Sequence, residues 1–339
     1  MIPFSILDLS PIREGAAFAD ALAGTRRLAA HAEQAGYRRF WLAEHHGMPG
    51  IASIATSILI GDVAAHTESI RVGAGGVMLP NHSPLVVAEQ FGTLAALHGE
   101  RIDLGLGRAP GTDQPTAHAL RHDLRAAHRF EEEVAELRSY FRPLQPGQLV
   151  RAIPAAGRKV PIWILGSSTD SARVAADLGL PYAFASHFAP GMLMDALALY
   201  RANFRSSEEL DRPYVMVGMN AAVADTDAEA RVLFNSHRRM FRDVRRGRPG
   251  QLAAPIADLD AEMSPQEAAG IDQMLSFSIV GSPETAGRQV RQVLEATHAD
   301  ELLFTAQIFD EEASLRSVSL LAEVRDALAA AETGAGAAA

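Results

Sequence analysis

The chain has 339 residues, 48% hydrophobic and 21% charged, which is the composition of an ordinary globular protein with a large core. The absence of cysteine excludes disulfides, thiolate metal ligands and a cysteine nucleophile. A net charge of -10, without a basic tract that carries interleaved aromatics, argues against nucleic acid as a partner, and no apolar run has the length of a membrane span.

Short apolar runs alternate with amphipathic stretches along the whole chain. The opening MIPFSILDLSP lacks the basic region and cleavage site of a signal peptide, so a cytoplasmic location is expected. It contains the first predicted strand, FSILDLS, and the later ones are RFWLA, IRVGAGGVM, IDLGLG, VPIWILG, YAFAS, YVMVGMNAAV and ELLFTA. Helices are predicted over residues 18–36, 52–66, 85–98, 126–140, 169–178, 190–204, 226–242, 283–297 and 312–330.

Eight strand–helix units in succession are typical of parallel strands joined by crossover helices, so an α/β fold is expected. The pattern predicts a (β/α)8 TIM barrel, as one domain over residues 1–330 with a disordered tail over 331–339. An open doubly wound sheet is the alternative. It would carry a phosphate-binding glycine motif after its first strand, and PFSILDLSPIREG has none.

Two long insertions interrupt the repeating pattern. Residues 106–125 are polar and follow the fourth predicted strand, and residues 242–275 form a longer irregular stretch after the seventh. Loops of this length in a compact domain are usually functional or disordered. Both would rise from the barrel face where the strands end and where active sites lie, so the second is a candidate lid.

The second predicted strand ends in Glu44, His45 and His46. Because neighbours on a strand point to opposite faces, Glu44 and His46 should share one side and His45 should take the other. His45 is therefore a candidate general acid or base, and a structural Glu/His pair is the alternative. A metal site is not expected here, because two adjacent histidines on a straight strand cannot converge on one ion.

Glycines mark the next two strand ends. Gly75 and Gly76 lie within the third strand, where either a planar ligand packed on the backbone or a bulge would account for them. Gly107 and Arg108 end the fourth strand and suggest a flat ring beside a phosphate. A tight turn with a surface arginine is the alternative for that second pair.

The fifth predicted strand ends in Gly166, Ser167 and Ser168, directly before a helix. Free backbone N–H groups and hydroxyls at a helix N-terminus can bind an anion, and ordinary capping by Ser168 or Thr169 is the alternative. The stretch lacks the Gly-Lys-Ser/Thr of a nucleoside triphosphate loop, so a monophosphate fits better.

Four of these stretches occur in the order found in one family. AEHH, GGVMLPNHSPLVVAEQF, RIDLGLGRAPG and GSSTDSARVAADLGLP resemble the bacterial luciferase-like flavin monooxygenases, and the resemblance extends to about residue 325. It implies a (β/α)8 barrel that binds reduced FMN (FMNH2) at the carboxyl ends of its strands. By position, His45 matches an acid/base histidine and Glu44 a supporting neighbour.

The resemblance also assigns the cofactor-binding positions. Gly75–Gly76 match a pair joined by a non-proline cis peptide behind the flavin ring, and Arg108 matches an arginine at the flavin phosphate. Gly107 stands where light-emitting subunits have a reactive cysteine, which argues against light emission. The matches to the phosphate-binding turn are Gly166, Ser167, Ser168 and Ser171.

The activity implied is a reduced-FMN-dependent monooxygenase that uses O2 through a C4a-peroxyflavin on a small or medium organic substrate. The chain shows no second dinucleotide site, so a separate flavin reductase should supply the reduced FMN. The helix over 52–67 is apolar nearly all round, which predicts a homodimer. The alternatives are an oxidoreductase that uses the deazaflavin coenzyme F420, with Arg238 to Arg248 as the only candidate for its anionic tail, and a non-catalytic flavin-binding protein.

Overall fold

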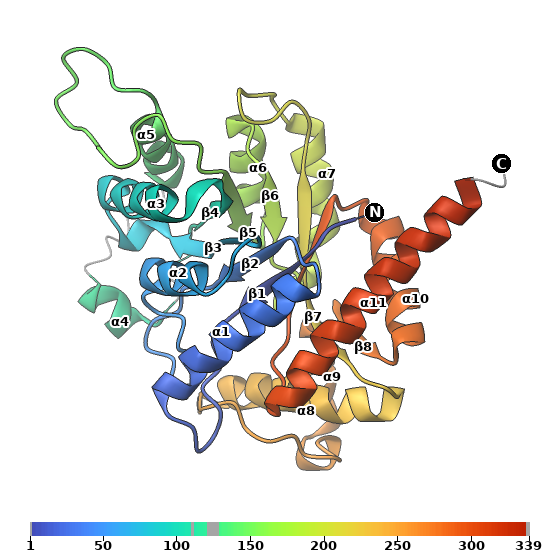
Figure 1. Ribbon diagram of the computed structural model, residues 1–339. Helices are drawn as coiled ribbons and strands as arrows, with labels where there is room; N and C mark the ends of the chain where they lie inside the picture. Colours follow the sequence, from blue (N-terminus) through green and yellow to red (C-terminus); the bar gives the residue numbers. More distant parts are fainter. Residues whose placement is uncertain (1, 110–111, 121–128, 337–339) are drawn as a thin grey trace.

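The computed structural model describes residues 2–109, 112–120 and 129–336. Its parallel strands are β1 (Phe4–Asp8), β2 (Arg39–Leu42), β3 (Arg71–Met78), β4 (Ile102–Gly107), β5 (Ile162–Gly166), β6 (Tyr182–Phe184), β7 (Val215–Val223), β8 (Ser278–Gly281) and β9 (Glu301–Thr305). Strands β1 to β7 pair in sequence, β7 then pairs with β9, and β9 pairs with β1 (Figure 1). These eight strands close a parallel barrel, which confirms the predicted (β/α)8 fold.

The short strand β8 was missed by the sequence patterns. It pairs only with the last four residues of β7, from Asn220 to Val223, and lies outside the closed ring. Only two of its four residues, Ile279 and Val280, have apolar side chains, so it lacks the consecutive apolar run that identified the similarly short β2 and β6.

Helices surround the barrel at nearly the predicted positions. They are α1 (Phe18–Gln34), α2 (Thr56–Ala65), α3 (Pro84–His98), α5 (Phe130–Phe141), α6 (Thr169–Leu178), α7 (Leu193–Asn203), α8 (Asp227–Arg245), α10 (Pro283–Thr297) and α11 (Glu311–Gly336). Thr226 and Ser282 cap α8 and α10 by accepting a backbone N–H three residues later, and Gly179 ends α6 in the left-handed conformation.

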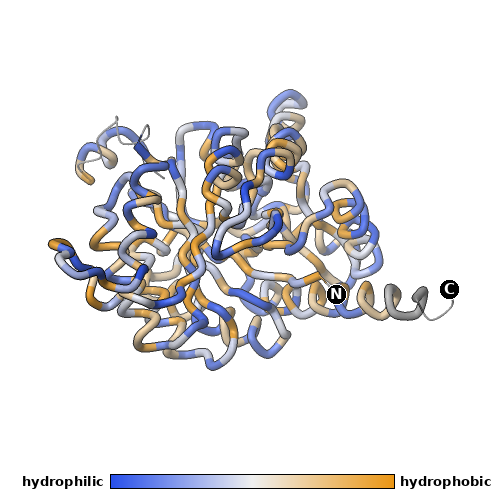
Figure 2. Tube along the Cα trace, turned by 90° about the horizontal axis from the view of Figure 1, so that it is seen from above, coloured by the Kyte–Doolittle hydropathy of each residue, from blue (hydrophilic) through white to orange (hydrophobic). Residues whose placement is uncertain are grey.

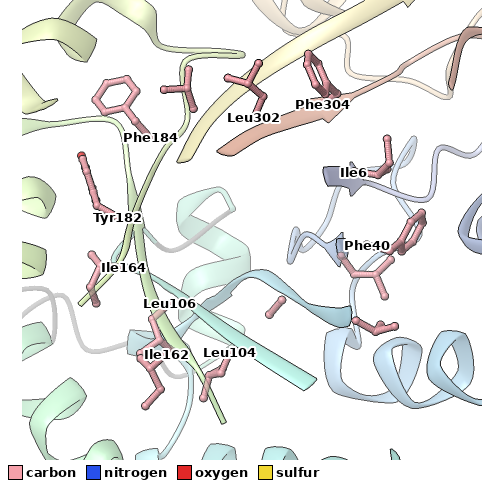
Figure 3. Close-up of a cluster of buried hydrophobic side chains, with 14 of the residues drawn as sticks. Ile6, Phe40, Leu104, Leu106, Ile162, Ile164, Tyr182, Phe184, Leu302 and Phe304 are labelled. Carbon is pink, nitrogen blue, oxygen red and sulfur yellow. The ribbon is translucent and has the colours of Figure 1, made fainter. Parts of the chain in front are cut away.

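The apolar core has two layers, because alternate residues of each strand point inward and outward. The inner layer fills the barrel and consists of Leu7, Trp41, Ala43, Trp163, Ala183, Met216 and Leu303. The outer layer lies between strands and helices, and Figure 3 shows its members on β1, β2, β4, β5, β6 and β9. In Figure 2 hydrophobic segments accordingly concentrate toward the middle of the molecule.

A buried charge network lies at the amino-terminal end of the barrel. The Arg39 guanidinium donates to Asp103 at 2.7 Å and to Glu301 at 2.8 Å, and it lies 4.7 Å from the ring centroid of Trp163. Burial works against the charged form, but the carboxylates of Asp103 and Glu301 raise the pKa of Arg39 above its ordinary value. The network joins β2, β4 and β9 across the barrel.

Both insertions contain helices that the sequence analysis did not anticipate. The first holds α4 (Gln114–Ala119), and residues 110–111 and 121–128 lie outside the described part of the chain. The second was expected to be irregular, which is wrong for α9 (Pro265–Met274) and for residues 242–245, which belong to α8. Ser264 caps α9, and Ile271 is fully buried, so local capping and tertiary packing together form this helix.

The second insertion packs over the carboxyl end of the barrel. Leu252 is 1% exposed and its N–H donates to Ile12 O at 2.8 Å, in the segment that follows β1. A Cβ added to Gly50, which follows β2, would lie 2.3 Å from Gly250 O. These contacts place the insertion at the end where the barrel strands stop.

Helix α11 continues beyond residue 330 to Gly336, so residues 331–336 are helical where a disordered tail was expected. Residues 337–339 lie outside the described residues. In Figure 1 the last turns of α11 extend away from the barrel. Within the described residues, no helix is both long enough and apolar enough to cross a membrane.

Candidate functional site at the carboxyl ends of the strands

Glu44 and His46 lie on one side of the chain after β2, as strand alternation predicts. Glu44 is 2% exposed, and its Oε1 accepts hydrogen bonds from His46 Nε2 at 2.9 Å and from His82 Nε2 at 2.8 Å. Its Oε2 accepts from the N–H of Met78 at 3.1 Å. Burial acts to raise the pKa of Glu44, but the hydrogen bonds from His82 and His46 hold it below its ordinary value.

His45 points to a different set of groups. Its Nδ1 is buried and has no hydrogen-bond partner among the described residues. It lies close enough to His187, which follows β6, to depress the pKa of that residue, and His187 acts in the same way on His237 of α8. Burial is the main cause of both shifts and lowers the pKa of His187 to about 4 and that of His237 to about 3. Both rings are therefore neutral at neutral pH.

Several other buried polar atoms at this end also find no partner within the described structure. They include His187 Nδ1, Asn220 Oδ1, both ring nitrogens of His237, Thr305 Oγ1 and Gln307 Nε2. A buried polar group without a partner costs about 1–3 kcal/mol, so such groups occur where a ligand or water completes the bonding. Strands β7 and β9 and helix α8 thus offer hydrogen-bonding groups beside His45 for a bound molecule.

The lowered pKa values of His187 and His237 should make the fold sensitive to acid. In the unfolded chain each histidine titrates near its ordinary value of 6.5, whereas folding lowers the pKa of His187 and His237. The stability contributed by these two histidines is therefore fully present above about pH 6.5, and it is lost as the pH falls toward their pKa values in the folded protein. We expect each group to remove about 2 kcal/mol between about pH 7.5 and pH 5.

Urea unfolding at several pH values measures this loss. In His237→Leu the free energy of unfolding should fall less between about pH 7.5 and pH 5, by the roughly 2 kcal/mol that one histidine contributes. His66→Leu, on the exposed surface, should leave the pH dependence unchanged. An equal slope in wild type and His237→Leu would show that His237 has the same pKa in the folded protein as in the unfolded chain.

The glycines of β3 and β4 are required by close backbone approach. The Gly75–Gly76 peptide is cis, as the resemblance implied, and the β3–β4 register shifts between Ala74 and Val77. A Cβ on Gly76 would lie 2.7 Å from Gly105 O. The bulge considered as an alternative for these glycines is therefore present.

Arg108 reaches from the end of β4 to the first turn of α6. Its Nη2 lies 3.4 Å from Asp170 Oδ2, and the side chain is 39% exposed. The structure thus brings together the arginine and the turn around Ser167 that the sequence proposed as one phosphate site. A 3.4 Å contact to an exposed carboxylate is weak, so the guanidinium keeps most of its donors available.

The serines of this turn differ in what their hydroxyls contact. Ser168 caps α6 by accepting the N–H of Ser171, so the ordinary capping alternative applies to it. Ser171 is 5% exposed, and its hydroxyl donates to Ser168 O at 2.8 Å and lies 2.9 Å from the Tyr182 hydroxyl. A Cβ on Gly166 would lie 2.1 Å from Ser171 Oγ, which explains the glycine. Ser171 therefore shapes the turn from within.

Three histidines of the site were not singled out from sequence. His82 follows β3 and His187 follows β6, so their positions after strands of a barrel were the available signal. His237 lies inside the apolar face of α8, between Phe234 and Phe241, where no strand-end rule applies. Its convergence with the others depends on how α8 packs.

A parallel barrel that gathers neutral histidines, a bulged glycine strand and a helix N-terminus at its carboxyl ends has the layout of a (β/α)8 enzyme. The chain belongs to the luciferase-like monooxygenase family, whose sequence model matches residues 2–301. It is 51% identical over 328 residues to a protein of Escherichia coli K12 described as a luciferase-like monooxygenase, with 96% of this chain and 98% of that protein covered.

The chain is also similar to a further curated protein and to a solved structure. It is 46% identical over 190 residues to the N-acetyl-S-alkylcysteine monooxygenase of Bacillus subtilis, covering 55% of this chain and 57% of that protein. The crystal structure of apo-MsnO8 superposes with a TM-score of 0.90 at 35% identity, covering 96% of this chain and 99% of that one.

Two more distant structures share the fold. The oxygenating constituent of 3,6-diketocamphane monooxygenase from Pseudomonas putida, in complex with FMN, has a TM-score of 0.70 at 19% identity, with 95% of this chain and 97% of that chain covered. An F420-dependent secondary alcohol dehydrogenase has a TM-score of 0.67 at 14% identity, with 95% and 98% covered. At these identities the likeness concerns the barrel alone.

Proposed function

We propose that the protein is a monooxygenase that uses reduced FMN, delivered by a separate flavin reductase, to oxygenate a small or medium organic substrate. The observation that carries this proposal is the pairing of two features at one barrel end. Arg108 reaches the first turn of α6, and His45 presents a buried Nδ1 without a partner among the described residues. Both lie after strands that flank the bulge at Gly75–Gly76.

The residues present fit this cofactor. Arg108 and the backbone N–H groups of Ser167 and Ser168 would hold the phosphate at the start of α6. The Gly75–Gly76 bulge and Gly107 would support a flat ring. The space beside Gly107 holds the side chain of Met78, a flexible group that would move aside for the ring. When bound, reduced FMN supplies the electrons that activate O2. His45 would take or give a proton at Nδ1 beside it, and Glu44 would hold the adjoining segment through Met78.

The ion pairs made by arginines of the run Arg238 to Arg248 favour FMN over the deazaflavin coenzyme. Arg238 pairs with Asp260 and Asp272, and Arg242 and Arg246 pair with Glu262 and Glu267. These three belong to the run Arg238 to Arg248 that was the candidate for an anionic tail, and the acidic partners named here all come from the second insertion. Arg239 of the same run pairs with Glu14 instead. The first three bind the insertion to α8 and so have less charge to offer a ligand.

An anaerobic titration with reduced FMN, oxidised FMN and reduced deazaflavin tests the cofactor. We expect preferential binding of reduced FMN, followed on mixing with air by flavin oxidation that differs in rate from that of the free cofactor. Tight binding of deazaflavin, with FMN ignored, would contradict the proposal. The substrate screen should include S-alkylated cysteines, because a relative is named for that activity.

The variant Arg108→Ala distinguishes binding of the flavin phosphate from binding of the flavin ring. We expect the variant to bind reduced FMN at least about 10-fold more weakly, because one charge-assisted bidentate contact contributes about 1.5–3 kcal/mol. Reduced riboflavin, which has no phosphate, should bind wild type and variant alike. Equal loss for both ligands would remove Arg108 from the phosphate site. Arg158→Ala, an exposed arginine in the loop before β5, is the matched control.

We also propose a homodimer formed through α2 and α3. Within the monomer α2 buries Leu59, Ile60 and Val63, yet Ile58 is 72% exposed, and Leu97 at the end of α3 is 70% exposed. Large apolar side chains on adjacent helices are typical of an interface. Sedimentation of Ile58→Glu should show a monomer where wild type is a dimer, whereas Phe18→Glu on α1 should leave the dimer intact. A dimer that withstands Ile58→Glu would exclude this surface.

A further inference from the structure

One cluster at the carboxyl end of the barrel has a composition that flavin binding does not explain. Glu44 Oε1, His46 Nε2 and His82 Nε2 approach one another so closely that the potential ligand atoms of the three residues all lie within 4.8 Å. Glu44 and His46 follow β2, and His82 follows β3 and the turn Leu79–Asn81. A carboxylate and two imidazoles on two neighbouring strands thus converge at one point.

The prediction of no metal site was based on the adjacent pair His45 and His46. His45 is indeed not part of the cluster and lies near His187. His82 was not considered in that prediction. His82 supplies the third ligand and comes from the segment after β3. Strands β2 and β3 are neighbours, with Leu42 paired with Ala74, so the segments that follow them lie close together. Where the sequence offered one carboxylate and one histidine on the same side of the chain, the structure brings together one carboxylate and two histidines.

From this convergence we propose that Glu44, His46 and His82 bind a divalent first-row transition metal such as Zn²⁺, Fe²⁺ or Co²⁺. Two imidazoles with one carboxylate are a ligand set of these ions, and Mg²⁺ and Ca²⁺ require oxygen ligands instead. Three protein ligands leave at least one position for water or a substrate. The proposal is independent of the flavin, and neither needs the other to be correct.

The surroundings hold the three ligands in place. The N–H of Met78 donates to Glu44 Oε2, which leaves Oε1 facing both imidazoles. The carbonyl of His46 accepts from Thr112 Oγ1 at 2.8 Å, which fixes the chain after β2. The His46 and His82 side chains are 14% and 32% exposed, so an ion could reach the site from solvent. Outer contacts of this kind are typical of metal ligands.

A bound ion would replace the two hydrogen bonds to Glu44 with metal–ligand bonds. Each imidazole would then carry its proton on Nδ1 and present Nε2 to the ion. The ion would join the segment after β2 to the segment after β3, next to His45 and close to the Gly75–Gly76 bulge. It would thereby position His45 and the bulge, and Glu44 is the one residue that belongs both to this cluster and to the segment assigned to the flavin.

Metal binding can be measured on the full-length protein without flavin. Protein freed of metal by a chelator, and of any histidine tag, is titrated with Zn²⁺ by calorimetry and with Co²⁺ by visible absorption. We expect one ion per chain, and at least about 100-fold weaker binding in both His46→Ala and His82→Ala, because each removes one of three ligands. His66→Ala is the matched control, since His66 faces only Asp62 on the surface.

Three results would overturn the proposal. Wild-type protein that binds neither ion, or that binds them as tightly as His82→Ala does, would leave the cluster as a hydrogen-bond network. Equal affinity for Mg²⁺ would exclude the transition-metal class. Because His82 is partly exposed, its variant should fold, and the far-UV circular dichroism of each variant checks this. The flavin titration has a separate readout, so failure of one proposal does not affect the other.

Discussion

Arg39→Met is expected to lower the free energy of unfolding by about 3–5 kcal/mol, because it leaves two buried carboxylates without their shared partner. The Arg39 side chain is 5% exposed, and those of Asp103 and Glu301 are fully buried. Methionine retains much of the apolar volume beside Trp163, so the loss would come mainly from charge. Asp103 keeps Arg71, and Glu301 keeps Ser5 and Tyr214, which limits the loss to this range.

Equilibrium unfolding in urea measures the effect. Arg27→Met is the matched control, because Arg27 also contacts a carboxylate, Glu311, but its side chain is 52% exposed. An exposed pair of this kind contributes about 0–1 kcal/mol. A similar decrease in the free energy of unfolding for the two variants would show that water reaches the amino-terminal end of the barrel and screens the charges around Arg39.

The barrel was predictable because its evidence is repetitive. Each strand needs only a short apolar run, each helix an amphipathic face, and eight repeats reinforce one another. Strand β8 and helix α9 escaped detection because neither has a repeat to support it. Only two residues of β8, Ile279 and Val280, have apolar side chains, and α9 depends on the tertiary burial of Ile271.

Site residues could be predicted from the sequence only where they lie within a strand or directly after one. Glu44, His45, the glycine bulge and the turn at Ser167 each stand directly after or within a strand, so chain order alone placed them together. His237 reaches the same end from α8, and the link between His82 and Glu44 spans 38 positions. Such contacts depend on helix rotation and side-chain direction, which a single sequence does not reveal.

His45→Asn is expected to reduce turnover by about 100-fold or more, the range for loss of a positioned acid or base. Asparagine can occupy the place of Nδ1 and offer a hydrogen-bonding group there to a bound ligand, but it cannot exchange a proton at neutral pH. Affinity for reduced FMN should therefore change little while the rate falls. The measurement is single-turnover oxidation of the substrate identified in the screen, alongside the anaerobic flavin titration.

Comparison with His187→Asn separates the two neighbouring histidines. The His187 side chain is half-buried beside Phe188, with its Nδ1 buried, and burial lowers its pKa to about 4, so it remains neutral throughout the assay range and should contribute mainly to binding. Burial also lowers the pKa of His45, so the wild-type rate should decline only below about pH 6.5, and this limb should disappear in His45→Asn. Full activity of His45→Asn with substrate would favour a non-catalytic flavin-binding role for this histidine. A rate loss confined to His187→Asn would transfer the acid/base assignment to the end of β6.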